Sequence, residues 1–177
     1  MRIIAGTNKG RTLKAPKWEG LRPTSDKLRE TLFNVLQTRI EGARVLDMFS
    51  GTGAIALEAL SRGAVSATCV DNDRRATGLI AENAALCRES ERCVIIRDVA
   101  SRALQQLLPG GPFDIVVLDP PYDYPNLADA VRDAAGQRAT GGLIVLEHSS
   151  RVAPPEPGGL TLTRTIKSGD SALTFYA

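Results

Sequence analysis

The fold class is decided by one stretch of the sequence, Val45-Leu46-Asp47-Met48-Phe49-Ser50-Gly51-Thr52-Gly53-Ala54-Ile55-Ala56. An apolar run of strand length comes first, a tight turn at 50–53 follows, and a helical pattern continues to residue 61. This order of strand, glycine turn and helix is typical of the first unit of a parallel α/β sheet. The spacing of Gly51, Gly53 and Ala56 fits a turn that approaches a nucleotide cofactor, although the pattern alone is a weak signal.

Strands and helices keep alternating after residue 61, which predicts a sheet covered by helices. We expect further strands at 67–70, 93–97, 114–118 and 143–147, and helices at 74–88, 101–108 and 127–135. The last two expected strands, 160–166 and 172–176, are separated by too few residues for a crossover, so they must form a hairpin. The predicted fold is therefore α/β, with a seven-stranded sheet that is mostly parallel and has an antiparallel last strand.

Residues 1–40 differ from the rest of the chain in charge. They hold nine basic and three acidic side chains, a net of +6, whereas the other 137 residues hold 13 and 17, a net of −4. Such a distribution is typical of contact with a polyanion, and a solvated surface without a partner is the alternative. Two extended segments, 2–5 and 11–14, predict a small β-hairpin, and a helix is expected over 26–38 with Thr24 or Ser25 as its N-cap. We therefore expect a basic N-terminal extension, 1–40, and a second domain, 41–177.

Four aspartates follow or end successive expected strands, namely Asp47, Asp71, Asp98 and Asp119. The carboxyl ends of parallel strands meet at one edge of a sheet, which is where ligands bind in open α/β folds. Asp71 comes 20 residues after Gly51 and is placed for the hydroxyl pair of a ribose. Asp98, with the N–H of Val99 beside it, is placed for an adenine amine. Each aspartate singly could be a loop cap, but four at one edge favour a ligand site.

Asp47 indicates which cofactor is expected. A carboxylate directly before the glycine turn would lie poorly beside a dinucleotide pyrophosphate, but it suits a ligand with an ammonium group, such as the methionine part of S-adenosylmethionine. We expect the cofactor-binding residues to be Asp47, Phe49, Ser50, Gly51, Thr52, Gly53, Asp71, Asn72, Asp98, Val99 and Asp119.

The expected catalytic residues form one corner, Asp119-Pro120-Pro121-Tyr122. Neither proline has a backbone N–H and each restricts the residue before it, so the corner is stiff. The Asp119 carboxylate and the Pro120 carbonyl can accept hydrogen bonds from an exocyclic amine, and the Tyr122 ring can stack on its base. These groups suit an in-line methyl transfer from a sulfonium to the amine of an exposed or flipped-out base, which needs positioning but no metal or covalent nucleophile. The alternative is an ordinary proline turn with Asp119 as a cap.

Composition excludes several other classes of protein. No apolar run approaches the roughly 18 residues of a membrane span, so no membrane contact is expected. Three cysteines and one histidine, without metal-ligand spacing, predict no metal site, and the odd cysteine count fits a reducing cytoplasm. We expect a cytoplasmic monomer, and a structural rather than catalytic role for His148.

These segments together resemble the RsmD family of bacterial ribosomal RNA guanine-N2 methyltransferases. The resemblance includes residues 47–53, 57–64 and 119–122, and also the head (1–11 and 22–34) and the end (169–176), so it covers essentially the whole chain. It implies a Rossmann-like class I fold, S-adenosylmethionine as donor, and the 2-amino group of a guanine in 16S rRNA, free or in a small-subunit particle, as target. The RNA contacts would then include Arg2, Lys9, Arg11, Arg22 and Arg29. Residues 123–126 are not distinctive.

Three other functions stay open at this point. A DNA adenine- or cytosine-amino methyltransferase shares the corner, but it generally needs a target-recognition region for which this chain has no room. A protein glutamine methyltransferase would have Asn in place of Asp119 and gives no reason for a basic head. An RNA-binding module with a vestigial cofactor fold is disfavoured because Asp47, Gly51, Gly53 and Asp71 are all intact.

Overall fold

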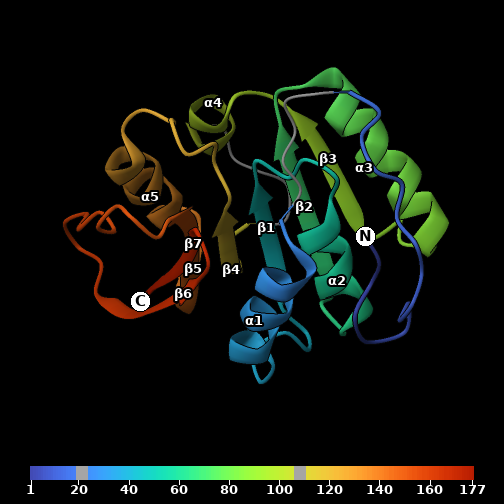
Figure 1. Ribbon diagram of the computed structural model, residues 1–177, viewed down its shortest axis with the longest axis horizontal. Coiled ribbons are helices and arrows are strands. Elements are labelled where there is room, and N and C mark those ends of the chain that lie inside the picture. The colour runs from blue at the N-terminus through green and yellow to red at the C-terminus, as the bar shows by residue number, and fades with distance from the viewer. Residues whose placement is uncertain (19–23, 106–110) are drawn as a thin grey trace.

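The computed structural model describes residues 1–18, 24–105 and 111–177 (Figure 1). Its elements in chain order are α1 (Asp26–Leu36), β1 (Arg44–Met48), α2 (Ala54–Ser61), β2 (Ser66–Asp71), α3 (Arg74–Cys87), β3 (Cys93–Arg97), α4 (Ala100–Gln105), β4 (Phe113–Leu118), α5 (Leu127–Ala135), β5 (Arg138–Ser149), β6 (Leu162–Ser168) and β7 (Ser171–Tyr176). No helix among the described residues is long and apolar enough to cross a membrane.

The seven strands form one sheet with the order β3-β2-β1-β4-β5-β7-β6. The first five strands pair in parallel, and β7 lies between β5 and β6 and is antiparallel to both. Figure 1 shows β3 and α3 at one end of the sheet and the β6–β7 hairpin at the other. The predicted fold class is confirmed. β2 and β3 lie on one side of β1, whereas β4 and β5 lie on the other, so the direction in which strands are added to the sheet changes between β1 and β4. Open α/β sheets bind ligands at this point, outside the carboxyl ends of the two strands.

β5 is longer than predicted. The sequence predicted a strand over 143–147, but the strand begins at Arg138, which pairs with Phe113 across an irregular register. The added residues at its start include two glycines and are mostly half-buried or exposed, so no apolar pattern marks them. Hydrogen bonding to a neighbouring strand extends this element beyond its buried core.

Alternate residues of the strands supply two hydrophobic cores, one on each face of the sheet. The first core contains Val45, Ala67, Ile115 and Val145 and is covered by α1, α2 and α3. The second contains their sequence neighbours, such as Leu46 and Val116, and is covered by α4 and α5. Both faces are therefore buried, as expected for a parallel sheet, and polar groups can reach solvent only at the strand ends.

The N-terminal segment packs on α2 and α3. The expected hairpin contains a single antiparallel bridge, between Arg2 and Thr12, rather than two strands. The Ile3 and Leu13 side chains belong to the same buried core as α1, α2 and α3. Gly6, at φ +83°, lies so close to the Ser61 carbonyl that a Cβ would be 1.8 Å from its oxygen. A boundary between domains at residue 40 stays a prediction.

Candidate active site

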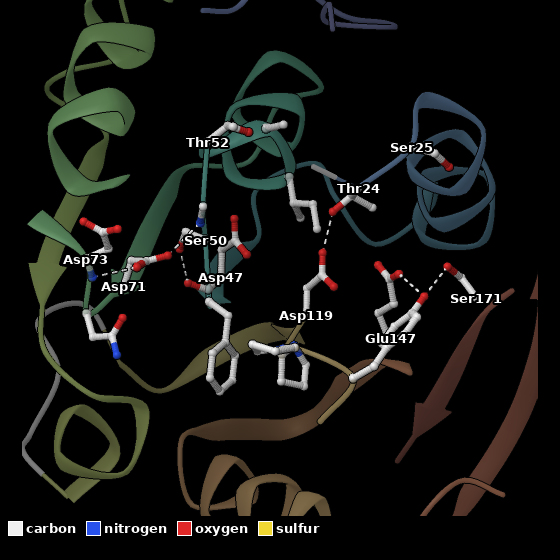
Figure 2. Close-up of a pocket in the computed structure, with 18 of the residues that line it drawn as sticks. Thr24, Ser25, Asp47, Ser50, Thr52, Asp71, Asp73, Asp119, Glu147 and Ser171 are labelled. Carbon is white, nitrogen blue, oxygen red and sulfur yellow. Dashed lines mark hydrogen bonds between the residues drawn. The ribbon is translucent and has the colours of Figure 1, made fainter. Parts of the chain in front are cut away.

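The described residues surround a pocket of about 510 Å³ at the carboxyl ends of β1, β2, β4 and β5, which is within the usual size range for a small-molecule site (Figure 2). The predicted residues that line it are Asp47, Phe49, Ser50, Gly51, Thr52, Asp71, Asn72, Asp119, Pro120, Pro121 and Tyr122. The corner of two prolines and the glycine turn, although far apart in sequence, therefore face one cavity.

The glycine turn is held to β2 by a carboxylate. Asp71 Oδ2 accepts a hydrogen bond from Gly51 N at 2.9 Å, and its Oδ1 accepts one from Asp73 N at 2.9 Å. Gly53 adopts a φ of +75°, and a Cβ there would lie 3.1 Å from the Ile80 side chain. Gly53 therefore does not line the pocket, and its role is to let the turn pack against α3.

Asp47 is a buried carboxylate with an unused acceptor. It is only 1% exposed; its Oδ2 accepts a hydrogen bond from Ala56 N at 3.2 Å, but Oδ1 has no partner among the described residues. Burial, and then the nearby charge of Asp119, raise the pKa of Asp47 well above its ordinary value. A buried group of this kind is unfavourable unless a ligand supplies a positive charge or a donor.

The corner is fixed by hydrogen bonds to neighbouring elements. The Asp119 backbone N–H donates to Met48 O at 3.3 Å, and the Tyr124 N–H donates to Pro121 O at 2.9 Å. The Thr24 hydroxyl donates to Asp119 Oδ2, so the segment before α1 reaches the carboxylate (Figure 2). Tyr122 is 41% exposed and lines the pocket, so part of its side chain can be reached by a ligand.

Glu147 lies beside this corner, and it was not among the site residues expected from the sequence. It is 7% exposed, lines the pocket, and contacts the Tyr122 hydroxyl, which donates to Glu147 Oε1 at 3.4 Å. Burial, followed by the charge of Asp119, raises the pKa of Glu147 to about 8. The signal was present, because Glu147 follows the apolar run of β5 just as Asp119 follows that of β4.

Other residues of the pocket were also absent from the expected set, namely Trp18, Thr24, Ser25, Ala54, Ile55, Asp73, Arg75 and Ser171. The Arg75 guanidinium lies 5.1 Å from the centre of the Trp18 ring, and Asp73 binds Arg75 with an oxygen–nitrogen distance of 2.7 Å. Ser25 is the N-cap of α1, one of the two residues expected there. These contacts bring the N-terminal segment to the rim of the pocket.

Asp98 and Val99, like Gly53, are predicted cofactor residues that lie outside the set that lines the pocket. The Asp98 carboxylate accepts a hydrogen bond from Val99 N at 2.8 Å and lies 3.5 Å from Arg102. Asp98 N donates to Asp71 O at 3.2 Å, so this turn adjoins the end of β2. A role for Asp98 and Val99 in cofactor binding stays a prediction.

The predicted RNA contacts divide into three groups. Arg2, Lys9 and Arg11 are exposed, whereas Arg22 lies outside the described residues. The prediction for Arg29 is wrong, because its side chain is 0% exposed and donates to Arg2 O at 2.5 Å and to Asp26 Oδ1 at 3.1 Å. Arg29 also lies 3.9 Å from the buried Glu58, so it joins the N-terminal segment to α2. The amphipathic pattern of α1 does not reveal this, because the Arg2 and Glu58 partners come from outside the helix.

His148 lines a second, smaller cavity rather than the main pocket. Its Nε2 is 2.8 Å from Thr174 Oγ1 and its Nδ1 is 3.0 Å from Ser149 O, and the ring is buried. Both ring nitrogens therefore have partners within the sheet, which agrees with the structural role expected for this residue.

The sheet order, the antiparallel β7 and the pocket over β1 and β4 are the Rossmann-like architecture of the class I methyltransferases. The family model described as Conserved hypothetical protein 95 matches residues 1–177. The chain is 36% identical to Ribosomal RNA small subunit methyltransferase D of Escherichia coli, over 99% of this chain and 89% of that one. It is 35% identical to YlbH of Bacillus subtilis, over 99% and 98% of the two chains. The solved structure of yhhF from E. coli superposes with a TM-score of 0.87 at 36% identity, covering 99% and 96%. The protein belongs to the RsmD family of methyltransferases.

Proposed function

We propose that this protein transfers a methyl group from S-adenosylmethionine to the exocyclic 2-amino group of a guanine in 16S ribosomal RNA, during assembly of the small ribosomal subunit. The name of the E. coli relative supports ribosomal RNA as the substrate. The observation that carries the reaction is the position of Asp119, Pro120 and Tyr122 on the same pocket as the glycine turn.

The pocket fits S-adenosylmethionine on one specific observation. Asp47 Oδ1 is buried without a partner among the described residues, and an ammonium group would supply both the missing donor and a positive charge. Asp71 is placed for a ribose, and Ser50, Gly51 and Thr52 would line the path between the two ends. When bound, this cofactor supplies an activated methyl group on a sulfonium.

The residues of the corner would orient the amine. Asp119 Oδ and the Pro120 carbonyl accept hydrogen bonds from the two hydrogens of the NH₂ group, which keeps the nitrogen in one orientation. Both acceptors also stabilise the positive charge that develops on nitrogen during transfer. The exposed Tyr122 ring supplies a face for the base, worth about 1–3 kcal/mol.

The test of the proposed function is a comparison of rRNA from cells with and without the protein. Nuclease digestion and mass spectrometry should show one N2-methylguanosine missing from 16S rRNA in the deletion strain, and the purified enzyme should restore it with S-adenosylmethionine. An unchanged rRNA with a missing N6-methyladenine or N4-methylcytosine in DNA would instead favour a DNA methyltransferase. Failure to bind S-adenosylmethionine in calorimetry would favour an RNA-binding module.

The exposed basic residues of the N-terminal segment give a separate prediction. Replacing Arg2 and Lys9 with glutamine should weaken binding of 16S rRNA. The negative slope of log K against log salt should become less steep by about one unit for each phosphate that the segment no longer neutralises. Filter binding over a range of salt concentrations measures this slope. Arg164→Gln, an exposed arginine on β6, is the matched control and should leave the slope unchanged. Equal slopes for the wild type and both variants would show that this segment does not contact the RNA backbone.

A further inference from the structure

The base side of the pocket contains a carboxyl group that the proposed chemistry does not use. Figure 2 shows the Glu147 side chain beside that of Asp119, with Ser171 next to it. Glu147 Oε1 accepts the hydrogen bond from Tyr122, whereas Oε2 is buried without a hydrogen-bond partner among the described residues. Leaving such an oxygen unpaired in a buried position is unfavourable, because it has lost its bonds to water and gained none. A buried acceptor at the pocket is therefore available to a ligand.

Guanine offers a donor at the matching position. Its 2-amino group and its ring N1–H are adjacent on one edge of the base, so they present three hydrogens along that edge. Asp119 and the Pro120 carbonyl provide acceptors for two of them. The unpaired oxygen of Glu147, next to Asp119, provides a third acceptor for the N1–H. Adenine and cytosine have an unprotonated ring nitrogen beside their amine, which would face the same carboxylate with a lone pair.

We propose that Glu147 determines the specificity of the site for guanine by accepting the hydrogen bond of the ring N1–H. This inference rests on the proposed function and adds a second carboxylate to the base-binding side. Its contact with the base is distinct from that of Asp119, because Asp119 binds the reacting amine and Glu147 binds the neighbouring ring atom.

The protonation state of Glu147 then controls how strongly the site discriminates between bases. The groups that face it are Asp119 after β4, Tyr122 of the corner and Ser171 at the start of β7. Burial, followed by the negative charge of Asp119, gives Glu147 a pKa of about 8, so the carboxyl is mostly protonated at neutral pH. The ionised form can accept the guanine N1–H through either oxygen and cannot donate, so it selects most strongly for guanine. The protonated form can still accept the N1–H through its carbonyl oxygen, but it can also donate to a lone pair, so it discriminates less between guanine and a base without the N1–H.

The experiment uses two RNAs that differ at this one position. One carries guanine at the mapped target, and the other carries 2-aminopurine, which keeps the 2-amino group but has an unprotonated N1. Ligated 16S rRNA, free or assembled with ribosomal proteins, is methylated at a series of pH values on both sides of the Glu147 pKa of about 8. We expect kcat/KM for guanine to rise by about tenfold over this range, because this parameter reports the ionisation of the free enzyme. For 2-aminopurine we expect kcat/KM to fall over the same range.

Glu147→Gln should flatten both pH profiles, because the amide can donate or accept at every pH. The ratio of kcat/KM for guanine to that for 2-aminopurine should then be close to one at the alkaline end, whereas the wild-type ratio should exceed about tenfold. Glu91→Gln, in the segment between α3 and β3, is the matched control and should keep the wild-type profiles. Calorimetry with S-adenosylmethionine should give equal affinities for the wild type and both variants, which shows that the cofactor side is intact.

The outcomes separate this inference from the function on which it rests. Parallel pH profiles of the wild type on the two RNAs would overturn the role of Glu147 while leaving methylation of guanine intact. Opposite profiles that persist in Glu147→Gln would overturn it as well, since another group would then control the choice of base. No methylation of either RNA would overturn the proposed function and this inference together.

Discussion

Replacing Asp119 with alanine is expected to lower kcat/KM for methylation of 16S rRNA by about 10³-fold, because the amine loses an acceptor that both orients it and stabilises its developing charge. Asp119→Asn keeps one acceptor oxygen but loses the negative charge, so its activity should lie between those of the wild type and the alanine variant. The affinity for S-adenosylmethionine should change little, since the cofactor contacts proposed above come mainly from Asp47, Asp71 and the glycine turn. Radiolabelled methyl transfer and calorimetry measure the two quantities.

The control for Asp119 is Asp133→Ala, because Asp133 is exposed on α5 and does not line the pocket. It should transfer methyl groups at the wild-type rate. An Asp119→Ala protein with comparable turnover would contradict the assignment of the corner as the catalytic group. An Asp119→Ala variant that had lost cofactor binding along with activity would show that Asp119 acts mainly by binding the methyl donor, S-adenosylmethionine.

Replacing Asp47 with asparagine is expected to weaken S-adenosylmethionine binding by about 10- to 100-fold while making the cofactor-free protein more stable. The affinity falls because a hydrogen bond to a charged group contributes about 1.5–3 kcal/mol. The stability rises because asparagine keeps the hydrogen bond from Ala56 N and removes a carboxylate that burial disfavours. Calorimetry and urea unfolding of the free protein measure the two effects, which have opposite signs.

The gain in stability should depend on pH. The pKa of Asp47 is raised in the folded protein, so its favourable contribution is complete below the pKa of the unfolded chain and is lost as pH rises through the folded value. The Asp47→Asn variant mimics the protonated form at every pH, hence the two proteins should be similar near the ordinary aspartate pKa of about 4 and should diverge above it. Asp133→Asn should not diverge from the wild type. A constant difference at all pH values would show that Asp47 is already ionised and satisfied in the free protein.

Much of the pocket could be predicted from the sequence, because parallel strands bring their carboxyl ends to one edge. The apolar runs located β1 to β4, and the residues at their ends identified Asp47, Asp71 and Asp119 without any knowledge of their contacts. The prediction missed a pocket residue where the residue after an apolar run belonged to no recognised motif. Glu147 follows the apolar run of β5 in the same way, but a glutamate in that position gave no motif to notice.

By itself the sequence determined the α/β class, the glycine turn and the stiffness of the corner, since these depend on local patterns of apolar residues, glycines and prolines. Only the tertiary structure decided which charges are buried. Arg29 is on the helix before the first strand of the sheet and looks like a surface arginine, but Arg2 O and Glu58 enclose it. Asp119 and Glu147 come from the ends of adjacent parallel strands, and the pairing of β4 with β5 places two carboxyl groups together. Burial and neighbouring charge depend on contacts between distant segments, which no local pattern records.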